Sequence, residues 1–85
     1  MAKAILSENA QAVLAHLQAT TEDETAQMIA DATGIGVKSV NGVATGLAKR
    51  GLVYRHEVEG YDKKVISLTA EGAAFDPAAI VEDAE

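Results

Sequence analysis

One stretch near the middle of the chain places polar and cationic side chains on a single helical face. At about 100° of turn per residue, a helix between Gly34 and Gly51 gathers short polar or positively charged side chains on one side and no acid. They are Lys38, Ser39, Asn41, Gly42, Thr45 and Lys49. Asparagine can pair with a base edge in the major groove of DNA, and ammonium groups bind phosphate. An ordinary solvated helix face is the alternative, but such a face would be expected to include acids.

The opposite side of the same stretch carries the apolar residues Val37, Val40, Val43, Ala44 and Leu47, which are expected to face a core. The stretch also contains two glycines, each of which costs a helix about 0.5–1 kcal/mol relative to alanine. Gly42 lies on the polar face, where a bare backbone favours close approach to a duplex. Gly46 lies at the edge of that face, and close packing of another helix explains it equally well.

Charge is distributed unevenly along the chain, which has a net charge of -6. Residues 1–35 carry -4 and residues 70–85 carry -5, whereas residues 36–69 carry +3. The local field decides where a polyanion binds, so the middle of the chain is the candidate surface. Its cations outside the polar face are Arg50, Arg55, Lys63 and Lys64. The last three either bind phosphate or pair across a hairpin with Glu57 or Glu59.

The sequence gives little support for catalysis, metal binding or dinucleotide binding. The chain has no cysteine, and its two histidines, His16 and His56, are far apart in the sequence. Gly34-Ile35-Gly36 lacks the third glycine of a dinucleotide-binding motif. No nucleophile, base and orienting residue occur together, so we expect no enzyme, no metal and no cofactor. With no membrane span and no signal peptide, a cytoplasmic protein is expected.

Three helices are expected to position the polar face, over residues 7–19, 22–33 and 37–50. Ser7 is a suitable N-cap for the first helix. Thr21 and Glu24 fit a capping box at the start of the second, and Gly34 ends it. The expected core residues are Leu14, Leu17, Ile29, Ile35, Val40, Leu47, Leu52, Ile66 and Leu68.

After Gly51 the pattern changes to β-branched residues, which predicts a hairpin of strands 52–58 and 64–69. Thr69 is expected to cap a short helix from about residue 70. Asp76-Pro77 predicts a second helix start, followed by an acidic tail over residues 78–85 that is expected to fray. The predicted architecture is α+β, mostly α: a single winged helix-turn-helix domain over residues 1–85, with a three-helix core, a two-stranded wing and a short C-terminal helix.

Three stretches resemble the MarR-type transcriptional regulators: residues 47–55 (LAKRGLVYR), 62–64 (DKK) and 68–72 (LTAEG). The resemblance covers roughly residues 7–75. It implies regulation of transcription by dimers on palindromic DNA, often with a small-molecule effector. Lys64 stands where the family's wing usually has arginine, and a lysine lacks the planar guanidinium fork. The family dimerises through long terminal helices that this chain lacks, so a monomer or weak homodimer without an effector pocket is expected.

Two functions therefore remain open. The first is a transcription regulator that binds double-stranded DNA, with helix 37–50 in the major groove and the wing on the backbone. The second is a winged helix that binds a protein partner and no DNA, because both ends of the chain are acidic. A continuous positive strip from Lys38 through Lys49 to Lys64 would favour DNA, and its interruption by Glu57 or Glu59 would favour a protein.

Overall fold

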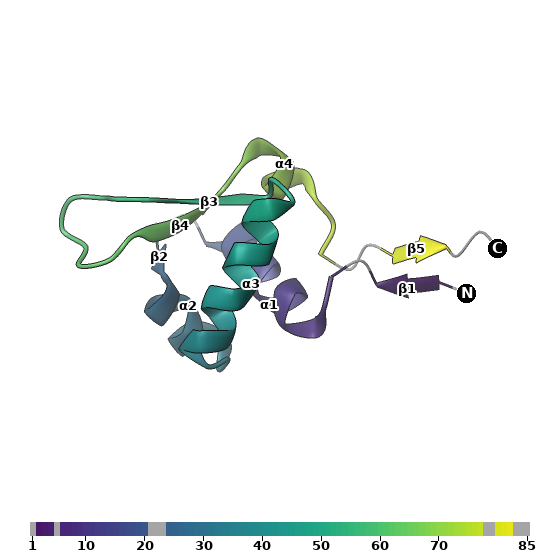
Figure 1. Cartoon of the computed structure of the whole chain (residues 1–85), viewed down its shortest axis with the longest axis horizontal. Helices are drawn as coiled ribbons and strands as arrows, with labels where there is room; N and C mark the ends of the chain where they lie inside the picture. The colour runs from purple at the N-terminus through teal and green to yellow at the C-terminus, as the bar shows by residue number, and fades with distance from the viewer. Residues whose placement is uncertain (1, 5, 21–23, 78–79, 83–85) are drawn as a thin grey trace.

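A computed structural model describes residues 2–4, 6–20, 24–77 and 80–82 of the chain. The elements in chain order are β1 (Ala2–Ala4), α1 (Glu8–Ala19), β2 (Glu24–Thr25), α2 (Ala26–Thr33), α3 (Val37–Lys49), β3 (Val53–His56), β4 (Val65–Leu68), α4 (Ala70–Ala74) and β5 (Ile80–Glu82). Helices α1, α2 and α3 pack together, the β3–β4 hairpin extends to one side, and β1 and β5 lie at the opposite end (Figure 1). This is the predicted winged-helix architecture.

Local capping explains where α1 begins and where α2 and α3 end. The Ser7 hydroxyl accepts a hydrogen bond from the Ala10 amide over 3.2 Å, as expected of an N-cap. Gly34 adopts the left-handed conformation at φ 78° that ends α2, and Gly51 does the same at φ 79° directly after α3. The predicted helices 7–19 and 37–50 are therefore confirmed, within one residue at each end.

The second helix begins later than predicted. Glu24 and Thr25 form the short strand β2, which pairs antiparallel with Ile66 and Val65 of β4. Thr25 caps α2 instead, because its hydroxyl accepts from the Met28 amide over 3.3 Å. The proposed capping box was wrong in giving Glu24 a helical position, since pairing with β4 holds its backbone extended. Its other member, Thr21, lies outside the described residues.

The wing is shorter than predicted. Strands β3 and β4 pair antiparallel from Val53↔Leu68 to His56↔Val65, and β4 lies between β2 and β3 in a three-stranded sheet. A loop over residues 57–64 connects the two wing strands. Thr69 caps α4 as predicted, because its hydroxyl accepts from the Gly72 amide over 3.0 Å.

The C-terminal segment differs from the helix that was predicted to start at Asp76-Pro77. The helix predicted from Pro77 is wrong at Ile80–Glu82, which forms β5 and pairs antiparallel with β1 in the register Ala2↔Glu82 to Ala4↔Ile80. Isoleucine and valine favour extended backbone, and β1 supplies their pairing partner from the other end of the chain. The remaining residues of the predicted acidic tail, 78–79 and 83–85, lie outside the described part of the chain.

The core lies between α1, α2, α3 and the base of the wing. Seven of the nine expected core residues are buried, while Ile35 and Leu68 are half-buried and pack against them. Val37, expected on the core stripe of α3, is 37% exposed. The pattern also missed Leu6, Val53 and Val65, which are buried. None of the helices in the described part of the chain combines the length and the apolar character needed to span a bilayer.

Candidate nucleic-acid interface

Helix α3 presents its polar face to solvent because its other face is held in the core. Val40, Ala44 and Leu47 are buried, and the helix packs against both α1 and α2. All of the candidate residues on this element are exposed, namely Lys38, Ser39, Asn41, Gly42, Thr45, Lys49 and the capping residue Arg50. The structure therefore brings these side chains together on one accessible surface.

The wing places three more cations beside this helix. Arg55, Lys63 and Lys64 are exposed and, with Gln27 and Asn41, line a groove of about 360 Å³ between α2, α3 and the wing. The apolar part of the groove is formed by Ala26, Val37 and Ile66. Within the described part of the chain, the four lysines of α3 and the wing have no salt-bridge partner. Their charges are thus available to an anionic ligand.

Arg55 links the wing directly to α3. Its Nη2 donates to the backbone carbonyl of Asn41 over 3.0 Å and to the Asn41 side-chain Oδ1 over 3.4 Å. Its Nη1 donates to the Thr45 hydroxyl over 3.4 Å. The Thr45 hydroxyl in turn donates to the Asn41 carbonyl over 3.0 Å. Sequence spacing carried no signal for this cluster, since it predicted only phosphate contact or cross-strand pairing for Arg55.

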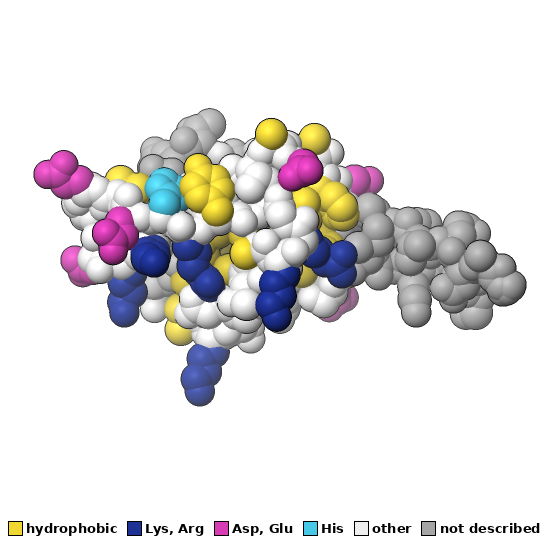
Figure 2. Space-filling model, turned by 45° about the horizontal axis from the view of Figure 1, so that its top comes forward, with side chains coloured by type: hydrophobic (Ala, Val, Ile, Leu, Met, Phe, Trp, Pro, Cys, Tyr) yellow, Lys and Arg dark blue, Asp and Glu magenta, His cyan; other side chains and the backbone are white. Residues whose placement is uncertain are grey.

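Cationic side chains gather in a band on one face of the molecule (Figure 2). The lysines and arginines of these elements are Lys38, Lys49 and Arg50 of the α3 segment and Arg55, Lys63 and Lys64 of the wing. Acidic side chains adjoin the band at its wing end, where the loop carries Glu57, Glu59 and Asp62. The band runs from α3 to the wing, and Figure 2 shows further acidic side chains above the band and toward its other end.

The two glycines of α3 border an open groove. A Cβ atom added to Gly42 or Gly46 would meet nothing within 4 Å. Both glycines help to line a groove of about 410 Å³ between α3 and the segment around Leu6, Ser7 and Asn9. No packing partner among the described residues therefore requires glycine at either position, which removes the packing explanation for Gly46.

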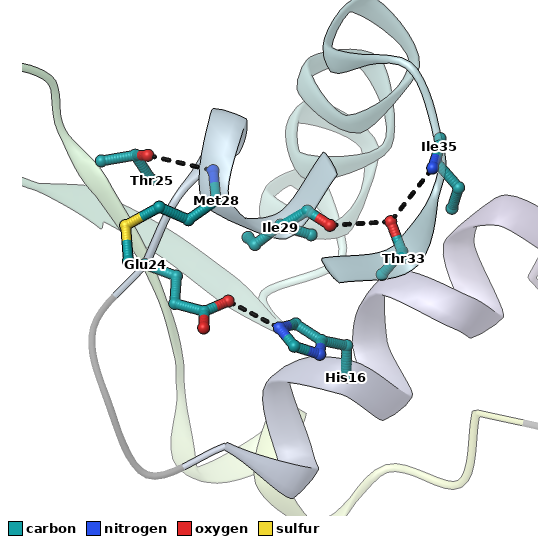
Figure 3. Close-up of polar contacts among 7 residues, drawn as sticks. All are labelled: His16, Glu24, Thr25, Met28, Ile29, Thr33 and Ile35. Atoms are coloured by element: carbon teal, nitrogen blue, oxygen red, sulfur yellow. Dashed lines mark hydrogen bonds and ion pairs between the residues drawn. The ribbon is translucent and has the colours of Figure 1, made fainter. Parts of the chain in front are cut away.

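Both histidines have structural contacts. His16 Nε2 lies 2.6 Å from Glu24 Oε1, so the side chains connect α1 to β2 beside the start of α2 (Figure 3). His56 Nε2 lies 2.7 Å from Ser67 Oγ, and its ring stacks on that of Tyr54 with centroids 4.9 Å apart. Among the described residues, no group of three His, Cys, Asp or Glu side chains could hold a metal ion.

A set of hydrogen bonds attaches α4 to α1 and to the residues that follow α3. The sequence pattern did not predict these contacts. Thr69 Oγ1 donates to the Gly51 carbonyl over 2.6 Å, and the Thr69 amide donates to the Leu52 carbonyl over 3.0 Å. Gln18 of α1 donates from Nε2 to the carbonyls of Gly72 and Phe75, over 2.8 and 2.6 Å. The LTAEG stretch, noticed for its resemblance, therefore has a structural role in holding the wing against the helices.

This architecture is similar to solved structures of transcription regulators. The Staphylococcus aureus regulator MepR superposes with a TM-score of 0.76 and 25% identity, covering 87% of this chain and 55% of that chain. The MepR–DNA complex superposes with a TM-score of 0.74 and 24% identity, over 86% of this chain and 60% of that chain. NMB1585, a MarR family regulator from Neisseria meningitidis, is 34% identical with a TM-score of 0.68, over 81% and 49% of the two chains.

The chain spans about half the length of these regulators. It has a winged-helix fold like that of the MarR regulators, which confirms the architecture expected from the resemblance. The similar structures are regulators of transcription. No protein-family model matches the sequence, and no curated protein matches it.

Proposed function

We propose that the chain is a transcription regulator that binds double-stranded DNA, with α3 in the major groove and the wing on the sugar-phosphate backbone. The observation that carries the proposal is the exposed cationic band joining α3 to the wing. A helix of about this length fits the major groove, and lysine and arginine neutralise phosphates. The similarity to a regulator solved in complex with DNA supports the same assignment.

The contacts divide into two chemical kinds. Asn41 and Thr45 lie near the middle of the exposed face of α3 and are assigned to base edges. We assign two further sets of side chains to phosphates. Phosphates beside the groove are assigned to Lys38, Ser39, Lys49 and Arg50, and phosphates beneath the wing to Lys63 and Lys64. Arg55 stands between the two sets, because it contacts both Asn41 and Thr45.

Binding is expected to be weak and salt-dependent. About four to six cations face the backbone, and each neutralised phosphate contributes roughly -0.9 to the slope of log K against log salt. The slope should therefore be about -3 to -5. The slope can be measured by titrating a fluorescently labelled duplex with the wild-type chain at several salt concentrations and following its anisotropy. Failure to bind any duplex at about 50 mM salt would contradict the proposal.

Lys49→Ala and Asn41→Ala should affect binding in different ways. Losing the Lys49 ammonium should weaken every duplex alike and make the slope less negative by about one unit. Losing the Asn41 amide should reduce discrimination between duplexes by roughly 1–3 kcal/mol and leave the slope unchanged. The same titration on a selected and a scrambled duplex distinguishes the two. If Asn41→Ala changes nothing while the wild type binds both duplexes equally, α3 contacts only the backbone.

Gly42→Ala should raise the stability of the fold but lower its affinity for DNA. Among the described residues, the added methyl group meets no atom within 4 Å beyond the neighbouring backbone of its own helix, and alanine favours a helix by about 0.5–1 kcal/mol. We expect the free energy of unfolding to rise by that amount while affinity for DNA falls, because the methyl group displaces α3 from the groove floor. Urea unfolding and the anisotropy titration test the two effects. Unchanged affinity would remove the close-approach role of Gly42.

A protein-binding module is the second candidate, favoured by one observation. The wing loop carries Glu57, Glu59 and Asp62 beside its lysines, and carboxylates at the end of a wing oppose approach to phosphate. If the wild type binds no duplex at low salt, this function replaces the first.

A further inference from the structure

Arg55 determines which hydrogen-bonding groups α3 offers to its surroundings. A guanidinium group has only donors, so its contact with the Asn41 side chain must be made by the amide oxygen. The Asn41 Nδ2 therefore points away from Arg55. The same guanidinium group holds the Asn41 carbonyl, which fixes the backbone next to that amide.

Thr45 is constrained by the same cluster. Its hydroxyl hydrogen is donated to the Asn41 carbonyl, and its oxygen accepts from Arg55 Nη1. The hydroxyl therefore has no hydrogen left for a base and can contact a base edge only through its remaining lone pair. The polar groups that remain available in this cluster are mainly donors, namely the two N–H bonds of Asn41 Nδ2 and the unused N–H bonds of Arg55.

We propose that Arg55 is a positioning residue that commits Asn41 to a guanine in the major groove. The inference rests on the proposed function. Guanine presents two adjacent acceptors, O6 and N7, whereas adenine presents the acceptor N7 beside the donor N6–H₂. Pairing with adenine needs the Asn41 Oδ1 and Nδ2 to face the base together, whereas here the oxygen faces the Arg55 guanidinium group and gives one of its two lone pairs to Nη2. With the oxygen held there, Nδ2 can still donate to guanine O6 or N7 without breaking the cluster.

The assignment replaces the general expectation that asparagine pairs with adenine. That pairing uses both ends of the amide, which requires a side chain free to turn its oxygen toward the base. Here the wing holds the oxygen, and the main-chain contact at 3.0 Å is the shortest of the Arg55 contacts. Turning Oδ1 toward a base would forfeit its 3.4 Å hydrogen bond from the guanidinium group.

The test measures base preference in the full chain. The wild type first selects duplexes from a random-sequence library at low salt, and each G·C pair of a selected duplex is then replaced by A·T. One replacement should weaken binding by roughly 5- to 150-fold, and Asn41→Ala should abolish that penalty. Arg55→Ala should reduce or reverse the same penalty, because the released oxygen can then accept from adenine.

Lys63→Ala is the matched control, because within the described part of the chain Lys63 makes no hydrogen bond or salt bridge to α3. Its loss should weaken both duplexes equally. Arg55→Lys supplies a second variant if Arg55→Ala does not fold, because a single ammonium cannot hold Asn41 and Thr45 as a fork does. It should give an intermediate penalty at unchanged charge.

Two results would overturn the inference alone: adenine preferred at the position that depends on Asn41, or an Arg55→Ala variant that weakens both duplexes by the same factor. The second result would make Arg55 a plain phosphate contact. Failure of the wild type to bind any duplex would instead overturn the proposed function, and this inference with it.

Discussion

Gly72→Ala is expected to lower the free energy of unfolding by about 3 kcal/mol or more, the upper end of the range for overpacked sites. A Cβ atom at this position would lie 1.8 Å from the Leu52 carbonyl oxygen and 2.8 Å from its carbon. Both neighbours are backbone, so no side chain can rotate away. Relief requires α4 to move from the start of the wing, which breaks the Thr69 contacts with Gly51 and Leu52.

Urea unfolding followed by circular dichroism measures this effect, and Gly46→Ala is the matched control. Gly46 is inside α3, where an added Cβ meets nothing within 4 Å, so that variant should gain about 0.5–1 kcal/mol. The two glycine replacements thus have opposite expected signs. A Gly72→Ala variant as stable as the wild type would mean that α4 does not contact Leu52 as described.

Leu47→Ala is expected to cost about 2–5 kcal/mol, which is a large part of the stability of so small a domain. Leu47 is 1% exposed and belongs to the core cluster beneath α3. Removing its side chain leaves a cavity between α3 and the elements packed under it. Because the loss is in the core, the exposed polar face of α3 loses the support that positions it.

Val37→Ala is the control for this prediction, because the helical pattern placed Val37 and Leu47 on the same stripe. Val37 is 37% exposed, and surface substitutions change stability by only about 0.5 kcal/mol in either direction. Urea unfolding of both variants should therefore separate them clearly. Equal losses would show that the two side chains are buried alike, contrary to the structure.

Much of this fold could be predicted because the signals that define it act over a few residues. The Ser7 cap, the glycine at position 34 and the apolar repeat of α3 each involve positions within about four residues of one another. The exposed cationic face of α3 followed from the same periodicity, since burying Val40, Ala44 and Leu47 leaves the other side in solvent. These features could be predicted without knowing the tertiary contacts between the elements.

Tertiary structure decided the features that depend on distant partners. The local pattern predicted Thr21 as the cap of the second helix, whereas pairing of Glu24 and Thr25 with β4 places the cap at Thr25. Ile80–Glu82 became a strand because β1 lay beside it.

The same dependence on distant partners shaped the candidate site. Arg55 contacts Asn41, 14 positions earlier, because the wing returns to α3, and no local pattern encodes that approach. Capping and periodicity are set by neighbours along the chain, whereas strand pairing and the Arg55 cluster form only when the hydrophobic core has brought their partners together.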